Sequence, residues 1–214
     1  MKSDRYSMSL NICEIFYSLQ GESTYSGLPC IFIRFSGCNL RCSWCDTTYA
    51  WSEGRKMAME DILQEICKFP CSLVEITGGE PLLQEESIEL MKVLHQNKYR
   101  ILLETNGTQS LQNIPDYVVK IVDVKCPSSG FSESFLMGNL KYLNPADELK
   151  FVLASREDYV FALNFIKNNS LEDRILLFSP VTNLLTSETL AKWMLKDGVP
   201  AHLQLQLHKI LHLA

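Results

Sequence analysis

Three cysteines, Cys38, Cys42 and Cys45, lie within eight residues of one another. Thiolates are soft ligands that suit zinc and iron–sulfur centres, and the C-x3-C-x2-C spacing lets three of them surround one centre. Three protein ligands leave one position on that centre open. An open position is what a site needs when it binds and activates a small molecule.

The kind of centre follows in part from what is missing around these cysteines. A structural zinc site usually takes four ligands, and no second C-x2-C pair occurs in the sequence. Ferredoxin patterns bring a fourth cysteine nearby, and none lies within 20 residues downstream of Cys45. An iron–sulfur cluster with one open iron is therefore favoured. A structural zinc ion or a cluster used only to store electrons stays an alternative.

Length and composition exclude several classes of protein. The 214 residues can bury one sizeable core, and the net charge of −5 offers no basic excess for a nucleic-acid backbone. No apolar run approaches the roughly 18 residues of a membrane span, and no apolar segment follows the N-terminus as in a secretory signal. Eight cysteines in such a chain are expected to be reduced thiols. The sequence predicts a cytoplasmic protein without membrane or nucleic-acid partners.

Apolar periodicity predicts strands that alternate with helices. Strands are expected over 12–17, 31–35, 73–76, 99–103, 117–124, 148–154, 174–178 and 201–207. Helices are expected over 59–66, 85–97, 155–166 and 186–197. Arg34 is a charge within an apolar strand, so it must face a polar partner or an anion in a cavity. The alternation favours a mostly parallel sheet with helices on its outer face.

The unusual polar residues follow the strands, where the active site of a parallel barrel lies. A complete barrel usually needs about 250 residues, so we expect an α/β fold with an incomplete TIM-type barrel of about six mostly parallel strands and outer helices. A doubly wound open sheet is the competing architecture. We expect a single domain over 1–214, with a flexible tail over about 1–10.

The cysteine triplet directly after the strand at 31–35 resembles the signature of the radical S-adenosylmethionine superfamily. Further segments are similar to the 7-carboxy-7-deazaguanine synthase family within it. These segments are Ser18–Ser23, Leu40–Thr47, Ile76–Pro81, Glu104–Gly107 and Gln206–Lys209.

This resemblance implies a chemistry carried by cofactors. A [4Fe-4S] cluster on Cys38, Cys42 and Cys45 would bind S-adenosylmethionine and cleave it to a 5′-deoxyadenosyl radical. That radical would start the ring contraction of 6-carboxy-5,6,7,8-tetrahydropterin to 7-carboxy-7-deazaguanine with loss of ammonia, a step of queuosine-type 7-deazapurine biosynthesis. No side chain is assigned as an acid or a base. The protein would position and protect the reacting groups.

The resemblance also implies the residues of the site. Thr47 would bind Mg²⁺. The residues expected at S-adenosylmethionine are Trp44, Asp46, Gly78, Gly79, Glu80, Glu104, Cys126, Pro127, Ser128, Ser179, Pro180, Val181 and Thr182. The residues expected at the pterin are Leu19, Gln20, Gly21, Glu22, Arg34, Thr77, His208 and Ala214. Arg34 would meet the substrate carboxylate, and His208 is expected on the polar face of the last strand.

The implied partners are the pterin, an electron donor such as a flavodoxin or a ferredoxin, and a second copy of the chain in a homodimer. Two other functions fit the cysteine loop. One is an activase that installs a glycyl radical on a partner protein. The other is an iron–sulfur electron-transfer protein without a reaction of its own, which would need no lined cavity.

Overall fold

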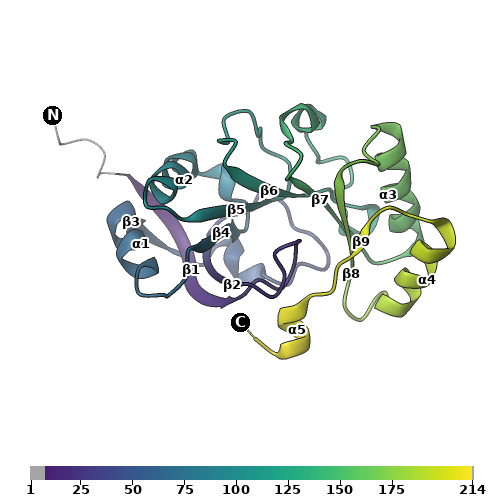
Figure 1. The fold of residues 1–214 in the computed structure, drawn as a ribbon, viewed down its shortest axis with the longest axis horizontal. Helices are drawn as coiled ribbons and strands as arrows, with labels where there is room; N and C mark the ends of the chain where they lie inside the picture. The colour runs from purple at the N-terminus through teal and green to yellow at the C-terminus, as the bar shows by residue number, and fades with distance from the viewer. Residues whose placement is uncertain (1–7, 214) are drawn as a thin grey trace.

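The computed structural model describes residues 8–213, and Figure 1 shows their arrangement. The strands are β1 Ser9–Leu19, β2 Pro29–Phe35, β3 Arg55–Ala58, β4 Leu73–Gly78, β5 Arg100–Thr105, β6 Val118–Asp123, β7 Glu148–Leu153, β8 Ile175–Pro180 and β9 His202–Leu203. The helices are α1 Met59–Ile66, α2 Glu86–Gln96, α3 Arg156–Asn168, α4 Ser187–Asp197 and α5 Leu207–Leu211. Short 3-10 turns cover Thr48–Trp51, Pro81–Leu83, Pro127–Ser129 and Met137–Tyr142.

All nine of these strands form one sheet in the order β3-β1-β2-β4-β5-β6-β7-β8-β9. The strands from β2 to β9 are parallel, while β1 pairs antiparallel with both β2 and β3. A doubly wound sheet reverses its strand order at a switch point, and the parallel run here never reverses. The mostly parallel α/β sheet is therefore confirmed, and its unidirectional winding is consistent with an incomplete barrel.

The two faces of the sheet have different chemistry because side chains alternate along each strand. On β2, Ile31, Ile33 and Phe35 belong to the large apolar core on the helix-covered outer face. Phe32 faces the other way, into a small apolar cluster at the base of the inner face. The helices α2, α3 and α4 pack on β5, β7 and β8 (Figure 1). The inner face is left free for a site.

Two expectations about the ends of the chain need correction. The strand expected over 201–207 is only His202–Leu203, and His208 lies in α5 instead of on the sheet. The Leu207 amide donates to the Gly21 carbonyl at 2.9 Å, which draws this segment away from β8 and over the loop after β1. At the other end, β1 begins at Ser9, inside the expected tail. Positions 1–7 of that tail lie outside the described residues. Within 8–213, no helix combines the length and apolar character needed to cross a membrane.

Candidate active site

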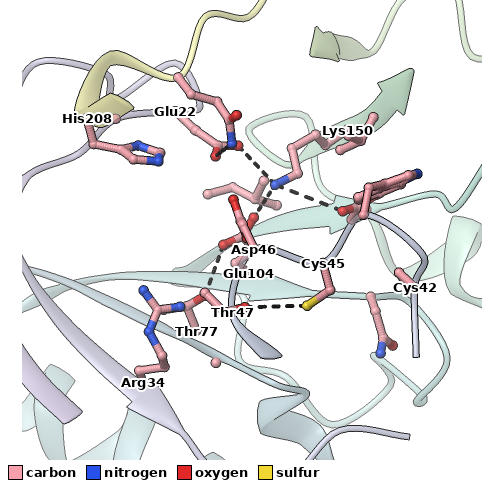
Figure 2. Close-up of a pocket in the computed structure, with 18 of the residues that line it drawn as sticks. Glu22, Arg34, Cys42, Cys45, Asp46, Thr47, Thr77, Glu104, Lys150 and His208 are labelled. Atoms are coloured by element: carbon pink, nitrogen blue, oxygen red, sulfur yellow. Dashed lines mark hydrogen bonds and ion pairs between the residues drawn. The ribbon is translucent and has the colours of Figure 1, made fainter. Parts of the chain in front are cut away.

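A cavity of about 680 Å³ opens on the inner face, a size that suits small-molecule sites. Its walls come from the loops that follow β2, β4, β5, β6 and β8, together with the segment after β1 and helix α5. The three cysteines lie on its wall. Several charged side chains reach into it (Figure 2). Parallel strands bring their carboxyl ends to one edge, which is why residues far apart in sequence meet here.

The donor set at Cys38, Cys42 and Cys45 fits an iron–sulfur cluster. All three are free thiols, partly exposed, and line the cavity. Within the described residues, no three histidine, cysteine or acidic side chains converge closely enough to bind one metal ion. In a cluster each thiolate binds its own iron, so the three sulfurs need not meet at a point. Burial raises the pKa of the Cys38 and Cys42 thiols, and both therefore stay protonated until metal replaces the proton.

The Gly78–Gly79 pair makes room for the start of the cysteine loop. A Cβ on Gly79 would overlap the Gly37 carbonyl oxygen and lie 2.9 Å from the Cys38 Cβ. Gly78 has φ of +142°, and a Cβ there would overlap the backbone of Phe35. The Glu80 amide also donates to the Gly37 carbonyl at 2.8 Å. The two glycines thus let the end of β4 support the loop that holds the cysteines.

Glu80 fixes the end of β5 beneath this turn. Its carboxylate is fully buried and accepts from the Thr105 hydroxyl at 2.8 Å, the Asn106 amide at 2.7 Å and the Leu82 amide at 3.0 Å. With these donors in place, the carboxylate does not reach the cavity surface. Glu80 lies beneath the cavity lining, and its expected place at S-adenosylmethionine stays a prediction. Its observed role is to hold Thr105 and Asn106 against the Gly–Gly turn.

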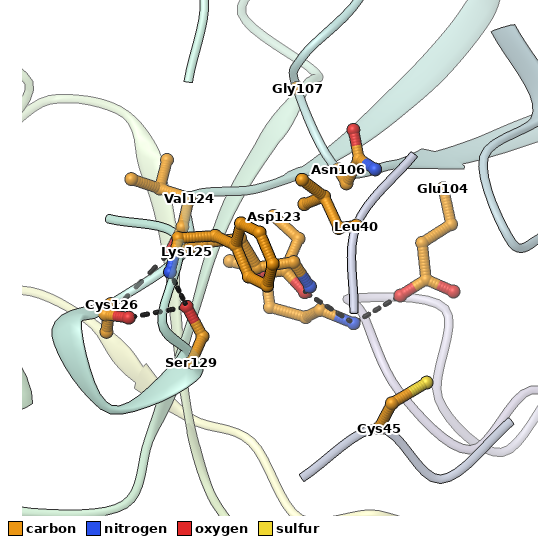
Figure 3. Close-up of polar contacts among 12 residues, drawn as sticks. Leu40, Cys45, Glu104, Asn106, Gly107, Asp123, Val124, Lys125, Cys126 and Ser129 are labelled. Carbon is orange, nitrogen blue, oxygen red and sulfur yellow. Dashed lines mark hydrogen bonds and ion pairs between the residues drawn. The ribbon is translucent and has the colours of Figure 1, made fainter. Parts of the chain in front are cut away.

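The turn at Pro127–Ser129 supports the cysteine loop from the other side. The Ser43 hydroxyl donates to the Ser128 carbonyl at 2.7 Å, and the Ser43 amide donates to the Ser129 carbonyl at 3.3 Å. Ser129 in turn donates to the Cys126 carbonyl at 2.6 Å (Figure 3). The Cys126 side chain is buried in the outer core, away from the cavity. It cannot serve as a fourth cluster ligand there.

A buried ion-pair network crosses the middle of the cavity. Lys150 on β7 contacts Glu104 on β5, and its Nζ lies 3.0 Å from Glu22 Oε2 (Figure 2). The Thr77 hydroxyl donates to Glu104 at 2.9 Å. Burial alone would raise the pKa of Glu104, but the neighbouring Lys150 lowers it to about 2. Both the lysine and Glu104 are therefore charged at neutral pH.

Arg34 offers a binding site for an anion at the edge of the cavity. Its Nε donates to Glu14 Oε1 at 2.7 Å, and Glu14 also accepts from the Tyr49 hydroxyl at 2.8 Å. The terminal guanidinium nitrogens make no hydrogen bond to any described residue, and Arg34 lines the cavity. This orientation leaves the planar fork available for a carboxylate.

The C-terminal segment covers the cavity next to the loop after β1. Gln206 Nε2 donates to Glu22 at 2.8 Å, and Lys209 Nζ donates to Asp46 at 2.8 Å. A Cβ on Gly21 would overlap the His208 ring. Glycine at position 21 is thus needed for His208 to reach the cavity from α5.

Comparison with known proteins decides which family has this arrangement. A model of the Radical SAM superfamily matches residues 32–183. The 7-carboxy-7-deazaguanine synthase of Koribacter versatilis (strain Ellin345) is 47% identical over 218 residues, covering 94% of this chain and 96% of the relative. That of Chlorobaculum tepidum is 42% identical over 204 residues, covering 94% and 93%. The crystal structure of QueE from Escherichia coli superposes with a TM-score of 0.78 at 25% identity, covering 94% of this chain and 95% of that one.

The chain belongs to the 7-carboxy-7-deazaguanine synthase family of radical S-adenosylmethionine enzymes.

Most of the residues that the family resemblance implied line this cavity. These are Leu19, Gln20, Gly21, Glu22, Arg34, Cys38, Cys42, Trp44, Cys45, Asp46, Thr47, Thr77, Gly78, Gly79, Glu104, Val181, Thr182 and His208. Those that do not line it are Glu80, Cys126, Pro127, Ser128, Ser179 and Pro180. Ala214 lies outside the described residues, and its expected contact with the pterin stays a prediction.

Several cavity residues of this family member were not among the site residues predicted from the sequence. They are Glu75, Asp123, Lys125, Lys150, Gln206 and Lys209. The signal for Glu75 and Lys150 was present, because each is a charge inside an apolar strand, as Arg34 is. The same rule applied to every strand would have given each a polar partner or a place in a cavity, but it does not select the face, since Lys120 on β6 satisfies it by pairing with Asp147 outside the cavity lining. Gln206 and Lys209 depend on the turn into α5, which no local pattern indicated.

Proposed function

We propose that this chain converts 6-carboxy-5,6,7,8-tetrahydropterin to 7-carboxy-7-deazaguanine and ammonia, in queuosine-type 7-deazapurine biosynthesis. The observation that carries the proposal is the 47% identity to a curated synthase over nearly the whole chain. The lined cavity supports it, because an electron carrier needs none. The identity to named synthases likewise favours this reaction over a glycyl-radical activase.

Two cofactors fit the cavity wall. Cys38, Cys42 and Cys45 would hold a [4Fe-4S] cluster, and S-adenosylmethionine would lie beside it against Gly78–Gly79, Trp44, Asp46 and Val181–Thr182. When bound, the pair supplies the radical chemistry that removes a hydrogen atom from the substrate.

The chain's own residues would bind and orient the pterin. The free end of the Arg34 fork would pair with the substrate carboxylate. Glu22 and Glu104, fixed by Lys150, would accept hydrogen bonds from substrate N–H groups. Helix α5, with His208, would cover the cavity and limit the access of water. Positioning of this kind, rather than acid–base catalysis, is the role we assign to the protein.

Thr47 is proposed to bind Mg²⁺ together with water and the substrate carboxylate, since Mg²⁺ prefers oxygen ligands and keeps several waters. Thr47 lies on the cavity wall, and its hydroxyl is 3.8 Å from the Cys45 sulfur. The metal would neutralise charge on the substrate during the rearrangement.

Anaerobic turnover tests the substrate and the metal together. The reconstituted protein, S-adenosylmethionine and a reductant should convert the carboxytetrahydropterin to a product with the absorbance of a deazaguanine. Mg²⁺ should raise the rate in the wild type, and Thr47→Ala should lower the rate about tenfold or more and abolish the response to Mg²⁺. Thr47→Ser should retain it, and Thr48→Ala, at the exposed neighbouring position, should behave as the wild type. Cleavage of S-adenosylmethionine without product would refute the assigned substrate.

The cellular context is also proposed. The electron donor would be a flavodoxin or a ferredoxin, since the cluster needs one electron at a time, and turnover with each purified donor would test this. The free thiols of the described residues suit a reducing cytoplasm, which localisation of a tagged chain would check.

A homodimer is supported by exposed apolar side chains near the C-terminus, Leu205, Ile210 and Leu211. A molar mass equal to that of a single chain, measured by light scattering, would contradict the dimer.

A further inference from the structure

Glu75 is a carboxyl group deep in the cavity that the chemistry above does not use. It lies on the inner face of β4, two residues before Thr77, and is only 3% exposed. Its register partners are Phe32 on β2 and Leu102 on β5, both apolar. Even so, Glu75 lines the cavity. A buried carboxyl among apolar neighbours costs free energy unless hydrogen bonds satisfy it.

Only one of its two oxygens is satisfied by the protein. Gln20 Nε2 donates to Glu75 Oε2, and Gln20 Oε1 accepts from the Glu22 amide at 3.0 Å. Gln20 therefore fixes Glu75 relative to the loop after β1. Oε1 accepts no hydrogen bond from any residue in 8–213. Burial, and then the charge of Glu104, raise the pKa of Glu75 well above its usual range. A donor from a ligand would favour the ionised form.

Glu148 shows what a purely structural carboxyl looks like on the same face. It is fully buried on β7, and a residue of the same loop, Thr24, donates to it. The Thr24 amide lies 3.1 Å from one of its oxygens and 3.3 Å from the other. Glu148 lies outside the cavity lining. Both glutamates are held by the loop after β1, but only Glu75 presents an oxygen to the cavity.

The surface beside Glu75 suits a flat heterocycle. Phe16 and Phe32 stack with ring centroids 4.8 Å apart and an interplanar angle of 9°, and both line the cavity. Arg34 lies two residues beyond Phe32 on β2, opposite Thr77. Strand geometry then puts the Cα atoms of Arg34 and Glu75 roughly 8 Å apart on the inner face, beside the stacked rings of Phe16 and Phe32. The two side chains can therefore approach opposite ends of one flat molecule that lies over the two rings.

We propose that Glu75, held by Gln20, is the residue that recognises the 2-amino-pyrimidine edge of the substrate, with Oε1 accepting a hydrogen bond from the 2-amino group. The inference rests on the proposed function. Arg34 then binds the carboxylate end of the same molecule, and the rings lie over Phe16 and Phe32.

The test uses the cluster-loaded enzyme with S-adenosylmethionine and no reductant, so that nothing turns over. Equilibrium dialysis measures binding of the carboxytetrahydropterin and of its analogue without the 2-amino group. In Glu75→Gln, the amide oxygen turns to Gln20 and its NH₂ turns to the cavity, where it opposes the 2-amino group. Binding of the pterin should weaken about 10- to 100-fold, as expected for loss of a charge-assisted hydrogen bond. The wild type should bind the analogue more weakly by a similar factor, and Glu75→Gln should no longer distinguish the two ligands.

Glu148→Gln is the matched control and should keep wild-type affinity for both ligands. Glu75→Asp keeps the carboxylate, but its shorter side chain moves the accepting oxygen away from the ligand, so pterin binding should weaken in this variant as well. If Glu75→Gln does not fold, Glu75→Asp is used in its place. Wild-type affinity in Glu75→Gln or Glu75→Asp, or an equal loss in Glu148→Gln, would overturn the proposal. Addition of reductant to the wild type separates the two hypotheses. Failure to convert the pterin would refute the proposed function, whereas conversion with unchanged binding in the Glu75 variants would refute only the role of Glu75.

Discussion

Gly79 shows at the scale of one residue how closely the cysteine loop packs on the sheet. In Gly79→Ala, the new methyl group would overlap the Gly37 carbonyl and press on Cys38. Backbone lies on both sides of the contact, so the loop must shift, at a cost of about 1–3 kcal/mol. The displaced Cys38 should bind iron poorly. We expect less iron and sulfide per chain after reconstitution and a lower Tm.

Gly138→Ala is the control for this substitution. Gly138 lies in the 3-10 turn Met137–Tyr142, and a Cβ there meets nothing within 4 Å. Its iron content and Tm should match the wild type. Full iron loading and an unchanged Tm in Gly79→Ala would show that the close approach does not constrain the cysteine loop.

At the scale of elements, Asp158 ties helix α3 to the turn that supports the cysteine loop. Its buried carboxylate accepts from the Ser128 amide at 2.8 Å and the Ala154 amide at 2.7 Å. Asp158→Ala would leave both amides unpaired, and we expect a loss of about 2–4 kcal/mol of unfolding free energy in denaturant titrations. Glu157→Ala, exposed on the same helical turn, should change stability by less than about 1 kcal/mol. An equal loss in the two variants would exclude this bracing role.

Some elements can be predicted from the sequence better than others. Apolar runs such as Ile31–Phe35 and Leu73–Ile76 identify buried strands, because only the core can take so many apolar side chains. The alternation of Leu203, Leu205 and Leu207 suggested one more strand, but the hydrogen bond from Leu207 to Gly21 diverts the chain into α5. A contact between residues so far apart in sequence leaves no local pattern. The cysteine loop was placed correctly, whereas Lys150 emerged only from the fold.

At the scale of the whole molecule, the sheet separates stability from function. Its outer face carries the large apolar core with the helices, and its inner face carries the charged side chains that line the cavity. The winding in one direction leaves the inner face without helices and so creates the cavity. Ionisable groups are tolerated there because they pair with each other, as Lys150 on β7 does with Glu104 on β5 and with Glu22 in the loop after β1.

This charged inner face predicts a specific sensitivity of the fold to acid. Lys150 lowers the pKa of Glu104 from an ordinary value of 4.5 to about 2, against the effect of burial. Because the folded pKa is the lower one, Glu104 stabilises the fold fully above about pH 5 and loses this contribution as the pH falls towards 2. The side chain is 29% exposed to the cavity, where water screens the pair. We therefore expect a loss of about 1 kcal/mol between pH 5 and pH 3.

Chemical denaturation of the cluster-free protein at several pH values isolates this effect. The difference in unfolding free energy between wild type and Glu104→Gln should shrink by about 1 kcal/mol from pH 5 to pH 3, since only the wild type loses the ion pair. Burial raises the pKa of Glu80 and Glu148, which act with the opposite sign. Both groups remain in the two proteins, and their contributions therefore cancel in the difference.

Glu89→Gln is the control, because it removes an exposed ion pair with Lys92 and should show no such trend with pH. A difference that stays constant with pH would mean that Lys150 does not hold Glu104 in its charged form.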